Sequence, residues 1–190
     1  MSRKRELEDL SCTDCSIYNC RSKSHQFPGF CLTTKDNDGH SIAADIEEIL
    51  EFAKRIGAKK IGIATCAGLI EESKTFADIL TARGLEYYSA ICKVGSVDKT
   101  EIGVLEEHKI KPGSHEAMCN PILQARILNY HNTDLNVVVG LCVGHDSLFT
   151  KYSKALVTTL VTKDRITGHN PVAALYTAHS YYKKLLQEKE

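Results

Sequence analysis

Four short runs rich in β-branched residues, separated by segments with helical periodicity, constrain the fold of this chain most. The runs are residues 60–65, 87–91, 135–141 and 157–161. Their lengths are those of β-strands, and a helical pattern at 71–83 separates the first two. Strands that alternate with helices indicate βαβ units, and therefore a parallel sheet that is covered on both faces.

Helix-start signals extend this pattern along the chain. Asn120 and Pro121 predict the N-cap and first residue of a helix that runs to about residue 130. Asn170-Pro171 predicts a last helix that ends in Lys183-Lys184, and an earlier helix is expected from Ser41 to Gly57. We therefore predict an α/β fold over residues 41–190, a small Rossmann-like three-layer domain with a mainly parallel four-stranded sheet.

Residues 1–40 differ from the rest of the chain. They hold four of the eight Cys and show almost no periodic apolar pattern. Such a segment buries too little apolar surface to offset the entropy of ordering it, so a bound metal is the expected source of order. We predict a Cys-rich metal-binding segment at 1–40 that precedes the α/β domain.

Charge and hydropathy narrow the setting in which the protein works. The chain has 24 basic and 24 acidic residues and no cluster of Lys and Arg, which argues against nucleic acid as a partner. Its first ten residues carry no apolar run after a basic head, and no 18-residue apolar run occurs, so we expect neither a signal peptide nor a membrane span. In the reducing cytoplasm that this implies, clustered Cys indicate metal binding or thiol chemistry.

The N-terminal Cys follow the spacing C-x2-C-x4-C-x10-C, through Cys12, Cys15, Cys20 and Cys31. Four thiolates suit a [4Fe–4S] cluster or Zn²⁺. Structural zinc sites favour two closely spaced pairs, and Cys20 and Cys31 do not form one. A [4Fe–4S] cluster is therefore the preferred interpretation; zinc and uncoordinated thiols remain as alternatives.

This motif resembles the N-terminal cluster motif of nickel–iron carbon monoxide dehydrogenases and, more loosely, of hybrid-cluster proteins. The matching residues are Cys12, Cys15, Cys20, Arg21, Pro28, Gly29 and Cys31. The resemblance implies a [4Fe–4S] cluster at the head, and it covers only about 20 residues, so the activity of those large enzymes is not implied. The whole chain, including residues 140–155 and 168–175, resembles a family of uncharacterised archaeal and bacterial proteins described as metal-binding.

The other four Cys are distant in sequence but share a placement. Cys66, Cys92 and Cys142 each follow a predicted strand, and Cys119 directly precedes the Asn120-Pro121 helix start. The carboxyl ends of parallel strands meet at one edge, where open α/β sheets bind their ligands. We predict that these four Cys hold a second metal or cluster. The alternatives are four small buried hydrophobic residues, or reactive thiols and a disulfide pair.

Polar residues lie beside these Cys. His145 and Asp146 come just after Cys142, where we predict a catalytic role or a role next to the metal; the alternative is that Asp146 or Ser147 caps a short helix. Lys163-Asp164-Arg165 follows the fourth strand at the same edge. The long irregular stretch 93–117 is predicted to be functional. No P-loop, dinucleotide fingerprint, nucleophile elbow or zincin motif occurs.

The function predicted from these features is that of an iron–sulfur protein. The head cluster would pass electrons from a protein partner to the second site, where a small molecule reacts. One alternative is a non-catalytic zinc module that senses or delivers metal or binds a partner. Another is thiol or sulfur transfer with Cys142 or Cys66 as nucleophile. The sequence specifies no reaction, so whether the protein is an enzyme is left open.

Overall fold

The computed structural model describes residues 45–187. The chain divides into two units, and the boundary in the sequence lies between Ala58 and Lys59. In the first unit, helix α2 (Asp45–Arg55) has acidic residues in its first turn and basic residues in its last, as the helix dipole favours. Arg55 Nε donates to Glu51 Oε1 at 2.6 Å, one turn away. The predicted N-cap Ser41 and the Cys-rich segment 1–40 lie outside the described residues.

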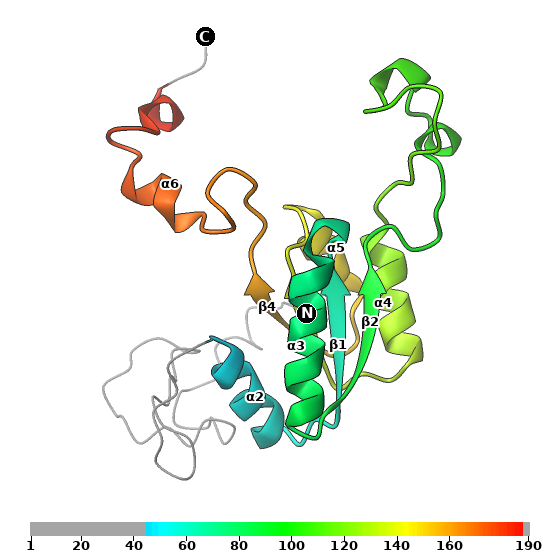
Figure 1. Ribbon diagram of the computed structural model, residues 1–190, viewed down its shortest axis with the longest axis vertical. Helices are drawn as coiled ribbons and strands as arrows, with labels where there is room; N and C mark the ends of the chain where they lie inside the picture. The colour runs from blue at the N-terminus through cyan, green and yellow to red at the C-terminus, as the bar shows by residue number, and fades with distance from the viewer. Residues whose placement is uncertain (1–44, 188–190) are drawn as a thin grey trace, which may run out of the picture. The chain divides into compact units, whose positions relative to one another are not determined.

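The second unit is built on a four-stranded parallel sheet with the strand order β2-β1-β3-β4 (Figure 1). The strands are β1 (Lys60–Thr65), β2 (Glu86–Ile91), β3 (Leu135–Val139) and β4 (Leu156–Val161). The helices are α3 (Ile70–Ala82), α4 (Pro121–Tyr130), α5 (His145–Tyr152) and α6 (Val172–Tyr176). Short 3₁₀ helices occupy Ala67–Leu69, Lys99–Ile102, Glu106–His108 and Lys183–Leu186. The predicted α/β fold with a parallel four-stranded sheet is therefore confirmed.

The order of the strands explains the layers. From β1 the chain runs through α3 to the edge strand β2. It then crosses back through α4 to β3 and continues through α5 to the other edge strand, β4. Because parallel crossovers are right-handed, a reversal of direction moves the connecting helices to the opposite face. Figure 1 shows α3 in front of the sheet and α4 behind it, and α5 packs against α4. None of the helices within residues 45–187 is long and apolar enough to cross a bilayer.

The two central strands, β1 and β3, form the buried heart of the sheet. All of β3 is buried, as are the residues of β1 after Lys60, and this matches their near-continuous apolar sequences. Phe76 and Leu80 of α3 are buried, while Phe149 of α5 joins Leu128 of α4 in a core cluster. The core therefore holds the strand ends that carry Cys66 and Cys142 in fixed positions.

One polar side chain, Asn136, lies fully buried in β3. Its Oδ1 accepts from Thr133 Oγ1 and its Nδ2 donates to Ser153 Oγ, both at 2.7 Å, so the amide is satisfied. Gly62 pairs with Asn136 in the neighbouring strand. A Cβ on Gly62 would lie 1.9 Å from Asn136 Oδ1, so a glycine is needed at this position.

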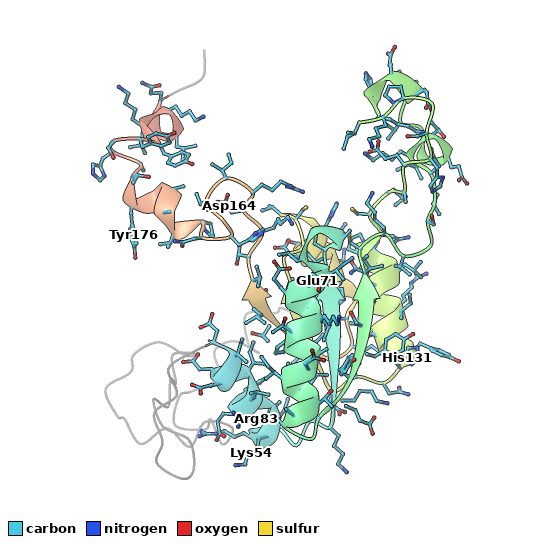
Figure 2. All side chains as sticks on the ribbon, viewed as in Figure 1. Lys54, Glu71, Arg83, His131, Asp164 and Tyr176 are labelled. Carbon is cyan, nitrogen blue, oxygen red and sulfur yellow. The ribbon has the colours of Figure 1, made fainter. Side chains whose placement is uncertain are left out.

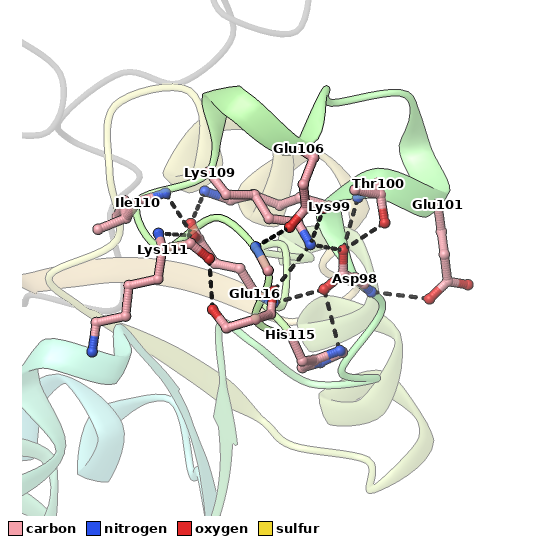
Figure 3. Close-up of polar contacts among 12 residues, drawn as sticks. Asp98, Lys99, Thr100, Glu101, Glu106, Lys109, Ile110, Lys111, His115 and Glu116 are labelled. Carbon is pink, nitrogen blue, oxygen red and sulfur yellow. Dashed lines mark hydrogen bonds and ion pairs between the residues drawn. The ribbon is translucent and has the colours of Figure 1, made fainter.

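The stretch between β2 and α4 is irregular, as predicted, and polar contacts within the stretch hold it together (Figure 3). Asp98 lies at its centre and accepts from the N–H groups of Thr100 and Glu116 and from Lys109 Nζ, at 2.7–2.9 Å. Lys109 also pairs with Glu106 at 2.9 Å, and its side chain is only 4% exposed. The Lys109 ammonium, with the Thr100 N–H and hydroxyl, holds the pKa of Asp98 well below its usual range.

The predicted last helix is wrong in length. Only Val172–Tyr176 is α-helical, and a separate 3₁₀ turn at Lys183–Leu186 follows. The large apolar residues of this short helix are exposed, with Leu175 at 72% and Tyr176 at 73%. A short helix without apolar packing is only marginally stable in water, so the local pattern is not enough to extend it.

Candidate metal centre at the sheet edge

Three of the Cys-bearing segments are tied together through the backbone. The Cys66 N–H donates to the Val139 carbonyl at 3.0 Å, and the Cys92 N–H donates to the Thr65 carbonyl at 2.8 Å. The Asn120 N–H, next to Cys119, donates to the Cys92 carbonyl at 2.7 Å. Since the chain winds in opposite directions from β1 and β3, the topological switch point lies between their carboxyl ends, the usual place of the ligand site in such sheets.

Two of the sulfurs lie in direct contact. Cys119 Sγ and Cys92 Sγ are 3.8 Å apart, compared with about 2.05 Å in a disulfide. Two sulfurs bound at about 2.3 Å to one tetrahedral ion would lie about 3.8 Å apart. Cys92 is 3% exposed and belongs to the core cluster, whereas Cys66, Cys119 and Cys142 are half-buried. Cys92 therefore fits the alternative of a buried hydrophobic residue as well as that of a ligand.

Nitrogen donors point at three of the four sulfurs. The Ala67 N–H donates to Cys92 Sγ at 3.3 Å. Lys163 Nζ donates to Cys66 Sγ at 3.4 Å, and the Arg165 guanidinium donates to Cys142 Sγ at 3.3 Å. Both cations come from the loop that follows β4, as the sequence suggested when it placed them at this edge.

These contacts shift the pKa values of the thiols in opposite directions. Burial by itself raises the pKa of the Cys66 thiol, but hydrogen bonds from the Gly68 N–H and from Lys163 outweigh it and leave that pKa below its ordinary value. Burial raises the pKa of the Cys92 thiol to about 12, and the neighbouring Cys119 adds to the rise. Cys66 is therefore the more easily ionised of this pair.

The loop that carries the two cations is ordered by its own hydrogen bonds. The Asp164 carboxylate, labelled in Figure 2, accepts from the N–H groups of Ile166 and Thr167 at 2.9 and 3.0 Å. The backbone of Asp164 exchanges two further bonds with His169, whose φ is +66°. The Asp164 carboxylate is thus committed to its own loop, while the Lys and Arg beside it reach the sulfurs.

His145 and Asp146 lie at the start of α5. The N–H groups of both donate to the Cys142 carbonyl, at 2.9 and 3.1 Å. The Asp146 carboxylate accepts from the N–H groups of Gly144 and Ser147 at 2.9 and 2.7 Å. These contacts give Asp146 a structural role in the turn after β3, and a role of either residue in chemistry stays a prediction.

Sequence reasoning missed Gln124. This fully buried side chain of α4 donates through Nε2 to the carbonyls of Thr65 and Ala90, at 3.1 and 2.7 Å. It therefore links β1 to β2 one residue before Cys66 and two residues before Cys92. The one signal in the sequence was a polar residue on the apolar face of a predicted helix.

Within residues 45–187, no three His, Cys, Asp or Glu side chains stand in the arrangement of a single-ion site. The Cys quartet at the sheet edge is nevertheless a concentration of thiols from four separate segments of the chain. The quartet of Cys12, Cys15, Cys20 and Cys31 lies outside the described residues. Metal binding by either quartet stays a prediction.

The fold and this edge define an α/β protein in which a parallel sheet carries free thiols at its carboxyl end. The chain belongs to the family described as "Protein of unknown function (DUF1847)", which matches residues 25–160. It is 54% identical over 144 residues to "Uncharacterized protein MJ0455" of Methanocaldococcus jannaschii, which covers 76% of this chain and 72% of that protein.

Among solved structures, the chain is similar to Dph2 from Pyrococcus horikoshii, with a TM-score of 0.39 and 19% sequence identity over 76% of this chain. Dph2 from the same organism with a 4Fe-4S cluster gives the same TM-score over 75% of this chain. The chain spans about a third of the length of the Dph2 chain, 33% in both cases.

Proposed function

We propose that this protein binds an iron–sulfur cluster at the carboxyl edge of the sheet, through Cys66, Cys92, Cys119 and Cys142, and that the cluster serves redox chemistry. The observation that carries the proposal is the sulfur contact of 3.8 Å between Cys92 and Cys119. These two residues lie on either side of the irregular stretch 93–117, between β2 and α4. Two thiols at this distance, outside a disulfide, have the spacing of two ligands on one metal ion, such as one iron of a two-iron cluster.

The polar surroundings of the sulfurs support the same assignment. A metal takes Cys as the thiolate, which a cation or an N–H donor stabilises. Lys163, Arg165 and the Ala67 N–H supply such donors to three of the sulfurs. Buried, uncoordinated thiols would need none of these charged neighbours, since a free Cys behaves as a small hydrophobic residue.

The choice of an iron–sulfur cluster over zinc rests on spacing. Structural zinc sites take their Cys mostly from closely spaced pairs, and no two of these four Cys are near in sequence. The N–H···S bonds at this edge are also the contacts that set the potentials of iron–sulfur clusters. A zinc centre without catalytic role is the alternative that metal analysis distinguishes.

The test is elemental analysis of full-length protein purified without oxygen. One variant replaces Cys12, Cys15, Cys20 and Cys31 by Ser, so that only the sheet edge can bind metal. A second adds Cys66→Ser and Cys142→Ser to that background. A matched control adds His145→Ala instead, because the His145 side chain is not among the proposed ligands.

We expect the first variant to contain iron and acid-labile sulfide and to absorb broadly in the visible, and we expect the second to lose both. The His145→Ala control should retain its iron. Stoichiometric zinc without sulfide or colour would support the zinc alternative, because Zn²⁺ is d¹⁰. A first variant without any metal contradicts the proposal.

A second candidate function, thiol or sulfur transfer, is favoured by one observation. The Cys66 thiol has a lowered pKa and lies 3.4 Å from Lys163 Nζ, so it has the surroundings of a nucleophile. Alkylation of the metal-loaded protein separates the two functions. A ligand of the cluster is protected from iodoacetamide, whereas a nucleophilic Cys66 reacts while the metal stays bound.

A further inference from the structure

We infer that Lys163 and Arg165 are positioning residues that compensate the charge of this centre and raise its reduction potential. The inference rests on the proposed function. It adds a role for the loop that follows β4, which contains none of the predicted ligands. Both residues lie beyond residue 160, where the match to the family ends, and the structure brings their side chains to the sulfurs.

The structure places one cation beside the sulfur of Cys66 and one beside the sulfur of Cys142. Lys163 Nζ lies 3.4 Å from Cys66 Sγ, at the end of β1, and Arg165 lies 3.3 Å from Cys142 Sγ, after β3. These two Cys follow the two central strands of the sheet.

The path of Lys163 to Cys66 runs past two glycines. A Cβ on Gly68 would lie 3.6 Å from Lys163 Nζ, and a Cβ on Gly140 would lie 3.8 Å from Lys163 Cδ and 1.9 Å from Leu69 Cδ1. Gly140 also has a φ of +66°, and its N–H donates to the Val161 carbonyl at 2.8 Å, which anchors the end of β4. The backbone at these two glycines therefore fixes the path of the Lys163 side chain to Cys66 Sγ.

The charge of the centre explains why two cations are present. Four thiolates around a cluster core of charge about +2 leave a net charge of about −2, which two cations balance. One-electron reduction adds a further negative charge, so nearby cations and N–H···S bonds stabilise the reduced form more than the oxidised form. The carboxylate between the two cations in sequence, Asp164, accepts the N–H groups of Ile166 and Thr167 in its own loop, and these dipoles offset part of its charge.

The experiment is a redox titration of the full-length protein with the four head Cys replaced by Ser, so that one centre is observed. The double variant Lys163→Met/Arg165→Met removes both charges, and Lys163→Arg/Arg165→Lys retains them. Lys74→Met, an exposed lysine of α3, is the matched control. Iron and sulfide are measured in every sample before the titration.

We expect the double Met variant to have a more negative potential, with the equilibrium constant for one-electron reduction lower by at least tenfold, or about 59 mV. The charge-retaining variant should keep most of the original potential, and Lys74→Met should keep all of it. An unchanged potential in a fully loaded double Met variant overturns the inference.

Failure of assembly is also decisive. If the double Met variant takes up no cluster, the charge-retaining variant determines the result. Loading of that variant supports compensation by charge, whereas loss of the cluster in both variants, with unchanged circular dichroism, overturns it. If the parent protein itself contains no iron and sulfide, the proposed function has failed, and the inference falls with it.

Discussion

Cys92 and Cys119, 27 positions apart in sequence, bring their sulfurs to 3.8 Å from each other across the base of a polar excursion. The Cys92 carbonyl accepts the Asn120 N–H at 2.7 Å, so the backbone beside the two residues is held together independently of any metal. The pair is consequently available for chemistry in the metal-free protein.

We predict that diamide oxidises this pair to a disulfide in metal-free protein. The two thiols lose two hydrogens to diamide, and the sulfurs approach from 3.8 Å to about 2.05 Å by side-chain rotation. Peptide mapping under non-reducing conditions should recover the Cys92–Cys119 link. Metal-loaded protein should resist the reaction, and a dominant link between Cys66 and Cys142 would contradict the geometry.

Replacement of Gln124 by Leu should destabilise the domain by about 1–3 kcal/mol, because it removes two buried hydrogen bonds that each contribute about 0.5–1.5 kcal/mol. The two acceptors, the carbonyls of Thr65 and Ala90, precede the strand ends that carry Cys66 and Cys92. Urea unfolding measures the change at constant m-value. Arg126→Leu, at an exposed site on the same helix, should stay within about 0.5 kcal/mol of the parent. Equal stabilities of the two variants would exclude a linking role for Gln124.

Gly62→Ala should lower the free energy of unfolding by about 1–3 kcal/mol, since the new Cβ would lie 1.9 Å from Asn136 Oδ1 and 2.9 Å from Leu128 Cδ1. Asn136→Ala removes the side-chain amide that the new methyl group at position 62 would contact. The double variant should therefore be less destabilised than the sum of the single variants, and thermal unfolding of all three measures this coupling. Gly68→Ala, whose nearest contact would be at 3.6 Å, serves as a nearly neutral control.

The Asp98 network should make stability depend on pH in the acid range. The pKa of Asp98 is lowered first by Lys109, that of Glu106 also by Lys109, and that of Glu116 by Lys99. Groups with a lowered folded pKa stabilise the protein above their unfolded values, about 3.9 for Asp and 4.3 for Glu, and lose this contribution as the pH falls below them.

We therefore expect the Tm to fall between about pH 5 and pH 3 and to fall less in Asp98→Asn, which starts from a lower Tm at pH 6. Asp78→Asn, at an exposed position of α3, should retain the full acid dependence. Identical slopes in the parent protein and in Asp98→Asn would show that the network contributes nothing to stability.

Much of the fold followed from local pattern. The β-branched runs predicted all four strands to within one or two residues, and Asn120-Pro121 predicted the start of α4, where the Asn120 side chain accepts the Leu123 N–H at 2.9 Å. The last helix, predicted from its Asn170-Pro171 start and its Lys183-Lys184 end, covers only Val172–Tyr176, and its Leu175 and Tyr176 are exposed. Amphipathic periodicity indicates which face of a helix can be buried, but a partner surface is needed to bury it.

The sequence by itself determined that Cys66, Cys92 and Cys142 follow strands, because strand length and composition are local properties, and parallel pairing then brings their carboxyl ends to one edge. Only the tertiary structure decided which atoms meet there. The 3.8 Å contact of Cys92 with Cys119, the link formed by Gln124, and the reach of Lys163 and Arg165 to the sulfurs join segments distant in sequence. Such contacts depend on side-chain rotamers and loop paths that the packed core selects, and no local pattern in the sequence encodes them.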